Sequence, residues 1–563
     1  MKLNFTKFIL STFLPMAAFG QTIVSTQSEN KKVIMEEFTG INCVYCPQGH
    51  AIAKQIQDSS PGNVFLINVH QGGFATPSGS QPDFRTPFGN AIVNQSYSGS
   101  GFGYPSGTVN RHNFPGMEMT AAGTTAMGRD KWVTAANQTL TQSSYVNTAV
   151  QATVDASTRV MTINVEVYYT GNSPIGTNKL NVVLLQNNTT GPQVGGGMGN
   201  NYVHMHRLID MITGQWGEDI TTTTAGSFVS KTYTYTIPES FNNIPAVLGE
   251  LELVVFIAEG NQEIISGNGT FPSYNNLEFN NEIAVNSIIQ IDPQCSGEVS
   301  PKIEIKNNGN DILTSLDINY SINGGASQTF TWTGELGGLQ KEWIELPNIS
   351  YSDQVNELTV VIPSDEMNDN NSNMITFEKA PVGTLNLALE IRTDNWGSET
   401  TWEILSSSGE VVESGSGYGN NQTYNIDLAL DLDCYTFRLL DEFGDGGARA
   451  TLKDANDQTL FNITGASYST SASRNFSTGE LMGVGDLSLN NTQIYPNPSN
   501  GIFNIALGKS AKIEVYDMTG RRIYVTNGST GVNTVNLNGK GTGIFVVKII
   551  EESSVITKKV VIK

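Results

Sequence analysis

The stretch that decides the amino-terminal fold runs from Lys32 to Pro47 and reads Lys-Val-Ile-Met-Glu-Glu-Phe-Thr-Gly-Ile-Asn-Cys-Val-Tyr-Cys-Pro. Residues 32–38 have the apolar run of a buried strand, and residues 39–42 turn the chain. Apolar residues at helical spacing follow Pro47. Cys43 and Cys46 therefore stand at a strand-to-helix junction.

Two cysteines three residues apart on the first turn of a helix bring their sulfurs onto one face, close enough to bond. The free N–H groups and the dipole at a helix N-terminus stabilise a thiolate, which lowers the pKa of a thiol placed there. Pro47 suits this first turn, where its missing N–H has no consequence. The spacing therefore predicts an exposed redox pair in which Cys43 attacks and Cys46 resolves.

Three other interpretations of the pair compete. A structural zinc site needs four ligands, and the sequence has no second Cys-x-x-Cys. Covalent haem attachment needs His directly after the second cysteine, where Pro47 stands. In an exported protein the pair could also be a static disulfide that staples a loop, and this alternative stays open.

The residues after the pair fit a thioredoxin-like α/β unit. Residues 63–70 read as a second strand, residues 84–92 as a helix, and residues 132–140 as a closing helix. In thioredoxin folds a cis-proline before a strand packs against the Cys-x-x-Cys and orients mixed disulfides. The resemblance implies this role for Pro105, which precedes the apparent strand that starts near Thr108.

Histidines lie close to the pair in the sequence. His50 stands four residues after Cys46 on the same helix face, and His70 ends the second strand. Either could tune the cysteines or assist proton transfer, and ordinary polar contacts or packing are the alternative. His204 and His206 could place two imidazoles on one side of a strand, but the sequence shows no third metal ligand.

Several motifs occur in the order found in one known family. They are Glu36-Glu37-Phe38-Thr39-Gly40, Cys46-Pro47-Gln48-Gly49-His50, Val69-His70-Gln71-Gly72-Gly73-Phe74, Tyr104-Pro105-Ser106-Gly107 and Tyr202-Val203-His204-Met205-His206-Arg207-Leu208. Together they resemble the Bacteroidetes outer-membrane protein family of the twenty-eight-kilodalton type. The resemblance spans about residues 31–285 and implies a thioredoxin-like domain followed by a β-sandwich. Asn42 stands where thioredoxins have Trp, which leaves the reactivity of the pair open.

The end of the chain forms a basic module behind an acidic body. Residues 484–563 carry nine Lys or Arg and five Asp or Glu, a formal charge of +4. Because the whole chain has a formal charge of −22, the preceding residues carry −26. Their motifs are Tyr495-Pro496-Asn497-Pro498, Asp517-Met518-Thr519-Gly520-Arg521 and the terminal Lys558-Lys559-Val560-Val561-Ile562-Lys563. They closely resemble the type-A C-terminal sorting domain of the type IX (Por) secretion system of Bacteroidetes.

This resemblance implies the type IX secretion machinery and its sorting peptidase as partners. The cargo is then released or attached to a surface polysaccharide, so we expect a protein that is secreted or attached to the outer face of the outer membrane. Residues 1–20 read as a secretory signal peptide, with Lys2 and Lys7 before an apolar stretch and Ala18-Phe19-Gly20 before the cleavage point. That stretch and all later apolar runs are too short for a transmembrane helix, so we expect none in the mature chain.

Composition excludes further classes of protein. Only 15% of the 563 residues are charged, and Asp plus Glu outnumber Lys plus Arg by 53 to 31. A surface of that sign repels phosphate backbones, so we expect no nucleic-acid partner. The 57 glycines are typical of short strands and turns rather than of a helical bundle.

Residues 380–482 contain two loops whose oxygens suit a cation. The candidate ligands are Asp394, Asn395, Asp441 and Asp445. Ca²⁺ takes six to eight oxygens, but the spacing departs from an EF-hand and Asp-Gly is also a plain turn signal. No cofactor is required, and Ca²⁺ is the one candidate. Cys295 and Cys434 fall in different modules, either as two thiols or as a cross-link.

We therefore expect a multidomain protein with an α/β thioredoxin-like N-terminal domain followed by all-β sandwich and jelly-roll-like modules. The expected segments are a signal peptide (1–20), a thioredoxin-like domain (21–144), a β-sandwich (145–288), an immunoglobulin-like β-sandwich (289–379), a jelly-roll-like β-module (380–482) and the sorting domain (483–563). The leading hypothesis is an exported cell-surface or secreted protein with a thioredoxin-like dithiol–disulfide site, able to exchange with protein thiols or disulfides, and with β-modules for spacing or binding; whether the pair turns over as an enzyme stays open. The alternative is a non-enzymatic surface adhesin in which Cys43–Cys46 is a structural disulfide.

Overall fold

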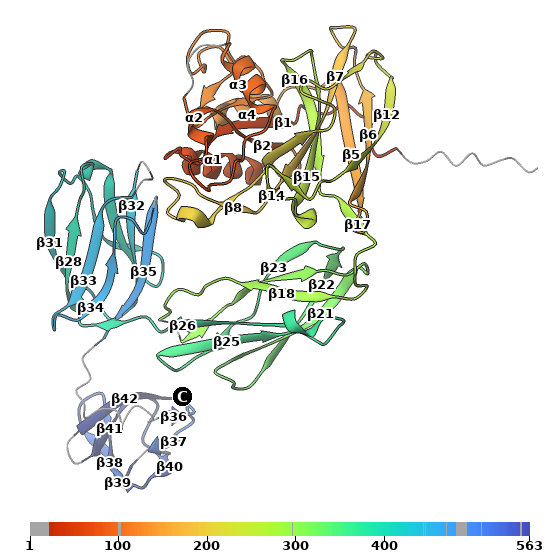
Figure 1. Cartoon of the computed structure of the whole chain (residues 1–563). Helices are drawn as coiled ribbons and strands as arrows, with labels where there is room; N and C mark the ends of the chain where they lie inside the picture. Colours follow the sequence, from red (N-terminus) through yellow and green to blue (C-terminus); the bar gives the residue numbers. More distant parts are fainter. Residues whose placement is uncertain are drawn as a thin grey trace, which may run out of the picture. The chain divides into compact units, whose positions relative to one another are not determined.

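The computed structural model of the chain describes residues 22–98, 103–295, 297–442, 444, 446–468, 470–479, 493–507, 509–551 and 554–563. The protein is multidomain and rich in β-strands (Figure 1), as the sequence predicts at this level. Two compact units divide the chain, one holding most residues up to Ser477 and the other holding Thr478–Lys563 with two short earlier segments. The expected signal peptide, residues 1–20, lies outside the described residues.

The amino-terminal region is built on two parallel strands, β1 (Val33–Thr39) and β2 (Val64–His70). Every residue of both strands is buried, which is typical of a parallel pair covered on both faces. β3 (Ser106–Val109) runs antiparallel beside β1, and β4 (Met127–Gly128) runs antiparallel beside β3. These strands therefore have the order β2-β1-β3-β4.

Helices cover both faces of this part of the sheet (Figure 1). Val33 of β1 packs in one apolar cluster with residues of α1 (Cys46–Ser59) and α4 (Trp132–Leu140). Ile34 packs in a different cluster with residues of α3 (Gly89–Tyr97). Successive side chains of a strand point to opposite faces, so β1 separates two cores.

The same sheet continues into the next part of the chain. Its further strands, outward from β2, are β10 (Arg207–Met211), β7 (Asn178–Gln186), β15 (Leu251–Ala258) and β16 (Ile264–Thr270), with β11 (Glu218–Ile220) pairing β7 off this path. One nine-stranded sheet thus contains strands from both residues 21–144 and residues 145–288.

A second sheet packs on one face of this extension. Its strands, in spatial order, are β12 (Phe228–Thr236), β6 (Val160–Tyr169), β5 (Val146–Asp155) and β17 (Ser273–Asn275). Ile163 of β6 and Val255 of β15 belong to one buried cluster, so the two layers form a β-sandwich. The remaining short elements of this region are α2 (Gly72–Ala75), β8 (Thr189–Gly191), β9 (Tyr202–His204), β13 (Ser240–Phe241) and β14 (Ile244–Pro245).

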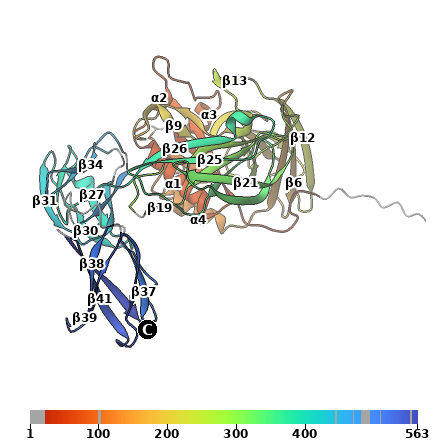
Figure 2. The same ribbon diagram turned by 90° about the horizontal axis from the view of Figure 1, so that it is seen from below.

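The next region is all-β, with its own apolar core. One sheet has β18 (Ile283–Ile288), β20 (Lys302–Asn307) and β23 (Lys341–Glu345), a second has β22 (Gln328–Leu336), β21 (Leu313–Ile322), β25 (Val355–Val361) and β26 (Ser372–Glu378), and a short pair has β19 (Glu298–Val299) and β24 (Ile349–Ser350). Figure 2 shows β21, β25 and β26 side by side.

Residues after 380 form another pair of sheets. The first contains β27 (Val382–Gly383), β35 (Ser471–Thr478), β32 (Cys434–Asp441), β29 (Thr400–Leu405) and β30 (Val411–Gly415), and the second contains β31 (Thr423–Ala429), β28 (Asn386–Arg392), β33 (Arg449–Asp454) and β34 (Thr459–Ile463). Cys295 and Cys434 are joined by a disulfide with a Cα–Cα distance of 5.8 Å. This settles the two alternatives for these cysteines in favour of a cross-link, which bridges 139 residues of sequence.

The carboxy-terminal module packs two sheets around a separate apolar core. The strands are β36 (Gln493–Tyr495), β37 (Ile502–Leu507) and β40 (Gly531–Asn536) in one sheet, and β39 (Arg522–Gly528), β38 (Ala511–Asp517), β41 (Gly543–Glu551) and β42 (Ser554–Ile562) in the other.

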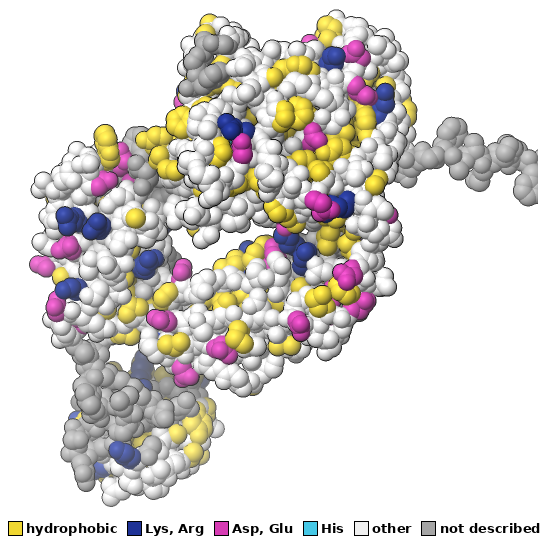
Figure 3. Space-filling model, viewed as in Figure 1, with side chains coloured by type: hydrophobic (Ala, Val, Ile, Leu, Met, Phe, Trp, Pro, Cys, Tyr) yellow, Lys and Arg dark blue, Asp and Glu magenta, His cyan; other side chains and the backbone are white. Residues whose placement is uncertain are grey.

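On the face of the chain drawn in Figure 3, charged side chains of both signs are scattered among many uncharged ones.

Candidate functional site

The cysteine pair lies at the junction between β1 and α1. Cys43 precedes the helix, which begins at Cys46 with Pro47 in its first turn. The two cysteines are bonded as a disulfide, with a Cα–Cα distance of 5.4 Å. Gly40 in the preceding turn has no room for a side chain, because a Cβ atom there would lie 2.4 Å from the Phe74 carbonyl carbon. The strand-to-helix junction predicted from the sequence is therefore present.

The structure buries this pair, so the expectation of an exposed site is wrong. Cys43 is 2% exposed and Cys46 is 0% exposed. The loop of residues 192–198, which comes from the β-sandwich region, covers the turn that carries Cys43. The backbone N–H of Val194 in this loop donates to the carbonyl of Ile41 at 2.8 Å.

Two further contacts fix this covering loop. The side-chain amide of Gln193 donates to the carbonyl of Cys43 at 2.9 Å and to that of Gly40 at 3.2 Å. Gly195 has a φ of +81° and approaches Val44 so closely that a Cβ atom would lie 2.0 Å from the Val44 carbonyl oxygen. The loop can therefore cover the pair only with glycine at this position.

Replacement of Gln193 by Ala should loosen the covering loop. We expect dithiothreitol to reduce Cys43–Cys46 at least about fivefold faster in Gln193→Ala, because the two lost hydrogen bonds together contribute about 1–3 kcal/mol. Alkylation of the freed thiols followed by mass measurement gives the rate. Gln138→Ala, at an exposed position of α4, is the matched control, and reduction of Cys295–Cys434 should be unchanged. Equal rates in both variants would show that the loop does not limit access.

Pro105 packs against the helix that carries the cysteine pair. The Tyr104–Pro105 peptide bond is cis, and β3 begins at the next residue, Ser106. A Cβ atom on Gly49 of α1 would lie 2.9 Å from the Pro105 Cβ. The glycine therefore lets the proline lie directly on the helix.

His50 lies on α1 with both ring nitrogens engaged. Its Nδ1 lies 2.6 Å from the hydroxyl oxygen of Tyr202, and its Nε2 lies 2.9 Å from Thr39 Oγ1. Burial, with smaller contributions from the charges of His204 and His206, lowers the pKa of His50 to about 3. The imidazole is therefore neutral at neutral pH, and it ties α1 to β1 and to β9.

His70 is buried among aromatic rings. Its ring centroid lies 5.2 Å from that of Phe84 and 5.3 Å from that of His204. Burial lowers the pKa of His70 well below its usual value, and neither ring nitrogen has a hydrogen-bond partner among the described residues. We call His50, His70, Phe84, Tyr202 and His204 the aromatic–histidine cluster; its successive rings are in contact.

The adjacent residues Glu36 and Glu37 of β1 have opposite environments. Glu36 forms a buried ion pair with Arg111, whose Nε donates to Glu36 Oε2 at 2.8 Å. Glu37 points to the other face, is 0% exposed, and its carboxylate oxygens accept no hydrogen bond from the described residues. Burial raises the pKa of Glu37 well above its usual value. Glu37 is not among the site residues predicted from the sequence, although two carboxylates inside a buried strand are a signal that could have found it.

His204 and His206 do not share a site. His204 Nε2 lies 3.2 Å from the carbonyl oxygen of Pro192, whereas His206 Nδ1 lies 2.8 Å from Glu252 Oε2. His206 has a φ of +50°, which turns the chain between the two side chains. Within the described ranges, no group of three or more His, Cys, Asp or Glu residues is arranged to hold a metal ion.

The acidic loops proposed for calcium contain local hydrogen bonds. Asp394 Oδ1 accepts from the backbone N–H of Trp396, and Asp441 Oδ1 accepts from that of Gly444. Asn395 Oδ1 accepts from the side-chain amide of Asn421. Asp445 lies outside the described residues. Calcium binding by these loops stays a prediction.

Comparison with known proteins supports both resemblances. The family described as "Outer membrane protein Omp28" matches residues 93–267, and the one described as "Secretion system C-terminal sorting domain" matches residues 493–563. Among solved structures, HBP35 of Porphyromonas gingivalis has 17% identity and a TM-score of 0.35, over 62% of this chain and 99% of that one. A protein from Agrobacterium tumefaciens has 14% identity and a TM-score of 0.28, over 45% of this chain and 98% of that one. No curated protein matches the chain significantly.

These matches confirm the expected resemblances and the expected location. In the part of the chain that the structure describes, no helix is both long and apolar enough to cross a membrane. The chain is thus similar to the outer membrane protein Omp28 family over residues 93–267 and to secretion-system C-terminal sorting domains over residues 493–563, and the protein is secreted or attached to the outer-membrane surface.

Proposed function

We propose that the protein exchanges disulfides with cysteines of other polypeptides through Cys43 and Cys46. The observation that carries this proposal is the bonded cysteine pair at the first turn of α1, directly after buried β1. The strand order β2-β1-β3-β4, with α1 and α4 on one face and α3 on the other, supports a thioredoxin-like domain in residues 21–144.

The exchange proceeds in two steps. In the reduced protein the Cys43 thiolate attacks one sulfur of a substrate disulfide, and the other substrate sulfur leaves as a thiolate that takes up a proton. The Cys46 thiolate then attacks the Cys43 sulfur, restores the Cys43–Cys46 bond and releases the second substrate thiolate. Two electrons pass from the pair to the substrate, and the reverse sequence oxidises a substrate dithiol. Cys43 is the attacking residue because it precedes the helix and is the less buried of the two.

Pro105 and His50 both contact the helix that carries the cysteine pair. Pro105 supports α1 from the side of β3, and the neutral His50 holds α1 against β1 and β9. We assign them as positioning residues. His70 lies within the aromatic–histidine cluster and takes no proton in this scheme.

The second candidate function is a surface binding protein in which Cys43–Cys46 is a static disulfide. The burial of both cysteines under residues 192–198 favours it. A disulfide that no partner can reach acts only as a cross-link, and binding would then reside in the β-modules.

The remaining assignments complete the proposal. Residues 145–288, 289–379 and 380–482 act as a β-sandwich, an immunoglobulin-like module and a jelly-roll-like module that space the redox domain or bind partners. Residues 483–563 guide export by the type IX machinery and are removed by its sorting peptidase. The mature protein is then released or joined to a surface polysaccharide.

Catalytic turnover tests this proposal. We expect the protein to accelerate the reduction of a disulfide-bonded peptide by dithiothreitol, because a thiolate at a helix start is a better attacking group than an ordinary thiol. The double variant Cys43→Ala/Cys46→Ala should lose this acceleration, and Cys295→Ala/Cys434→Ala should retain it. Equal acceleration by both variants, or none by the native protein, would favour the static disulfide.

A further inference from the structure

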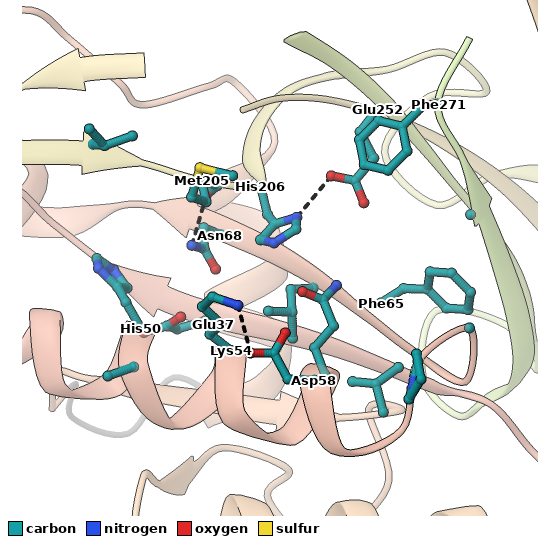
Figure 4. A pocket seen from close by; sticks show the side chains of 18 of the residues that line it. Glu37, His50, Lys54, Asp58, Phe65, Asn68, Met205, His206, Glu252 and Phe271 are labelled. Atoms are coloured by element: carbon teal, nitrogen blue, oxygen red, sulfur yellow. Dashed lines mark hydrogen bonds and ion pairs between the residues drawn. The ribbon is translucent and has the colours of Figure 1, made fainter. Parts of the chain in front are cut away.

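A large cavity lies beside α1 and extends along the helix from Pro47, in its first turn, to Pro61 beyond its end. It has a volume of about 810 Å³ and is bounded by α1, by β2, by the segment Tyr202–His206 and by the end of β16 (Figure 4). Cavities of about 300–1,000 Å³ are typical of sites for small molecules. Neither Cys43 nor Cys46 lines it.

Two neighbouring buried side chains in the cavity wall have unused hydrogen-bonding capacity. Glu37 of β1 and Asn68 of β2 are direct partners in the parallel register, and both line the cavity. Among the described residues, neither oxygen of Glu37 nor Oδ1 of Asn68 has a hydrogen-bond partner. The Asn68 Nδ2 donates to the carbonyl of Met205 at 2.9 Å, which fixes the amide and leaves Oδ1 as the free acceptor. A buried polar atom without a partner is destabilising by about 1–3 kcal/mol, so these atoms point to a bound group.

The charges around the cavity are balanced. Lys54 Nζ lies 2.6 Å from Asp58 Oδ2 at the edge formed by α1, and His206 Nδ1 lies 2.8 Å from Glu252 Oε2 on the opposite wall. Burial raises the pKa of Glu37, and its Oε1 lies 3.7 Å from Nε2 of the neutral His50. A charged ligand would therefore meet no unpaired counter-charge.

Two phenylalanines line the cavity at the end away from His50. Figure 4 shows Glu37 and His50 at one end, with Phe65 and Phe271 at the opposite end. Phe271 is 62% exposed and Val203 is 43% exposed, which leaves large apolar surfaces facing the opening. The cavity wall thus offers apolar surface from Phe65 and Phe271, and Glu252, which lies beside Phe271, is paired with His206.

We propose that this cavity binds an uncharged amphiphile, with an apolar or aromatic body and one hydroxyl or N–H group. The hydroxyl or N–H donates to Asn68 Oδ1 or to a carboxyl oxygen of Glu37, the acceptors that have no partner among the described residues. The body lies against Phe65 and Phe271. The proposed ligand contacts neither cysteine, although His50, a positioning residue for the pair, also lines this cavity.

Two fluorescent probes test the proposal on the full mature chain. N-phenyl-1-naphthylamine is uncharged and has one N–H, whereas 8-anilinonaphthalene-1-sulfonate has a similar aromatic body with an added negative charge. We expect saturable binding of the first at one site per chain and at least about tenfold weaker binding of the second. This ratio corresponds to about 1.4 kcal/mol.

Matched variants locate the probe. Ala51→Trp on α1 places a large side chain in the cavity and should weaken binding of the uncharged probe at least about tenfold, whereas Gln55→Trp, exposed on the same helix and outside the cavity lining, should not. Val203→Trp serves as a second blocking variant if Ala51→Trp fails to fold. Cys43→Ser/Cys46→Ser should bind the probe like the native chain, which separates this site from the redox proposal. Equal binding by the blocking and control variants, or equal binding of the two probes, would overturn the proposal.

Discussion

Cys46→Ser is expected to accumulate a mixed disulfide through Cys43, and Cys43→Ser is not. In the first variant the attacking sulfur is present and the resolving one is absent, so the intermediate with a substrate cannot be broken from within. In the second variant the remaining thiol, Cys46, is part of α1, whereas Cys43 precedes the helix, so we expect Cys46 to capture less partner. The expected difference is on the order of tenfold or more in captured partner.

The measurement is non-reducing electrophoresis of each variant after exposure to cell-surface protein, followed by mass identification of the linked peptide. Both variants remove the same disulfide, so any loss of stability affects them alike and each serves as the control for the other. Cys295→Ser/Cys434→Ser in the Cys46→Ser background should capture the same partners, because that cross-link lies elsewhere in the chain. Capture at equal levels by Cys43→Ser and Cys46→Ser would contradict the assignment of Cys43 as the attacking residue.

Acidification should destabilise the aromatic–histidine cluster. The pKa is lowered to about 3 for His50 and to about 4 for His204, chiefly by burial, whereas an unfolded histidine titrates near 6.5. As the pH falls below 6.5, the unfolded state binds protons that the folded state does not bind until the folded pKa is reached. At pH 4.5 each group therefore removes about 2–3 kcal/mol of stability, and the two together about 4–6 kcal/mol.

Glu37 acts in the opposite direction. Its folded pKa is raised, so the stability it contributes is fully present below its unfolded pKa of about 4.5 and is lost as the pH rises through the folded value. When the pH falls from 7 to 4.5, the contribution of Glu37 to the stability of the fold therefore rises, while that of the histidines falls. Two histidines, His50 and His204, oppose this single carboxyl, and the lowered pKa of His70 acts in the same direction as theirs, so we expect a net loss of stability.

Hydrogen–deuterium exchange of the peptides that cover residues 33–70 measures this local stability at pH 7 and pH 4.5, after correction for the intrinsic exchange rates. His204→Gln should reduce the pH dependence by about 2 kcal/mol, since its amide does not titrate. His112→Gln is the matched control, because His112 is partly exposed and paired with Glu263. An unchanged pH dependence in His204→Gln would show that the cluster is not the acid-sensitive element.

Local features of the redox region could be predicted from the sequence because they depend on neighbouring residues. The strand before Cys43, the helix that starts at Cys46 and the closing helix from Trp132 all follow from hydrophobic periodicity and turn residues. The predicted helix over residues 84–92 instead begins at Gly89. Pro87 disfavours helical backbone at the residue before it, which explains the late start.

Features that depend on distant parts of the chain could not be predicted. The cover over Cys43 comes from Gln193, 150 residues later, and no local pattern announces that contact. The single sheet formed by β2 and β10, and the partners of Glu36 and Glu37, likewise depend on which segments meet in space. The sequence could place the sulfurs at a helix start, but their burial required the structure.

The measurement that tests the central claim most directly is the reduction potential of Cys43–Cys46 in the full mature chain. The chain is equilibrated in glutathione or dithiothreitol buffers of graded potential, and the thiols are alkylated and quantified by mass. A pair that exchanges disulfides should titrate between about −120 and −270 mV, within the range of known exchange proteins. A potential below about −300 mV would contradict the account and identify Cys43–Cys46 as a structural disulfide.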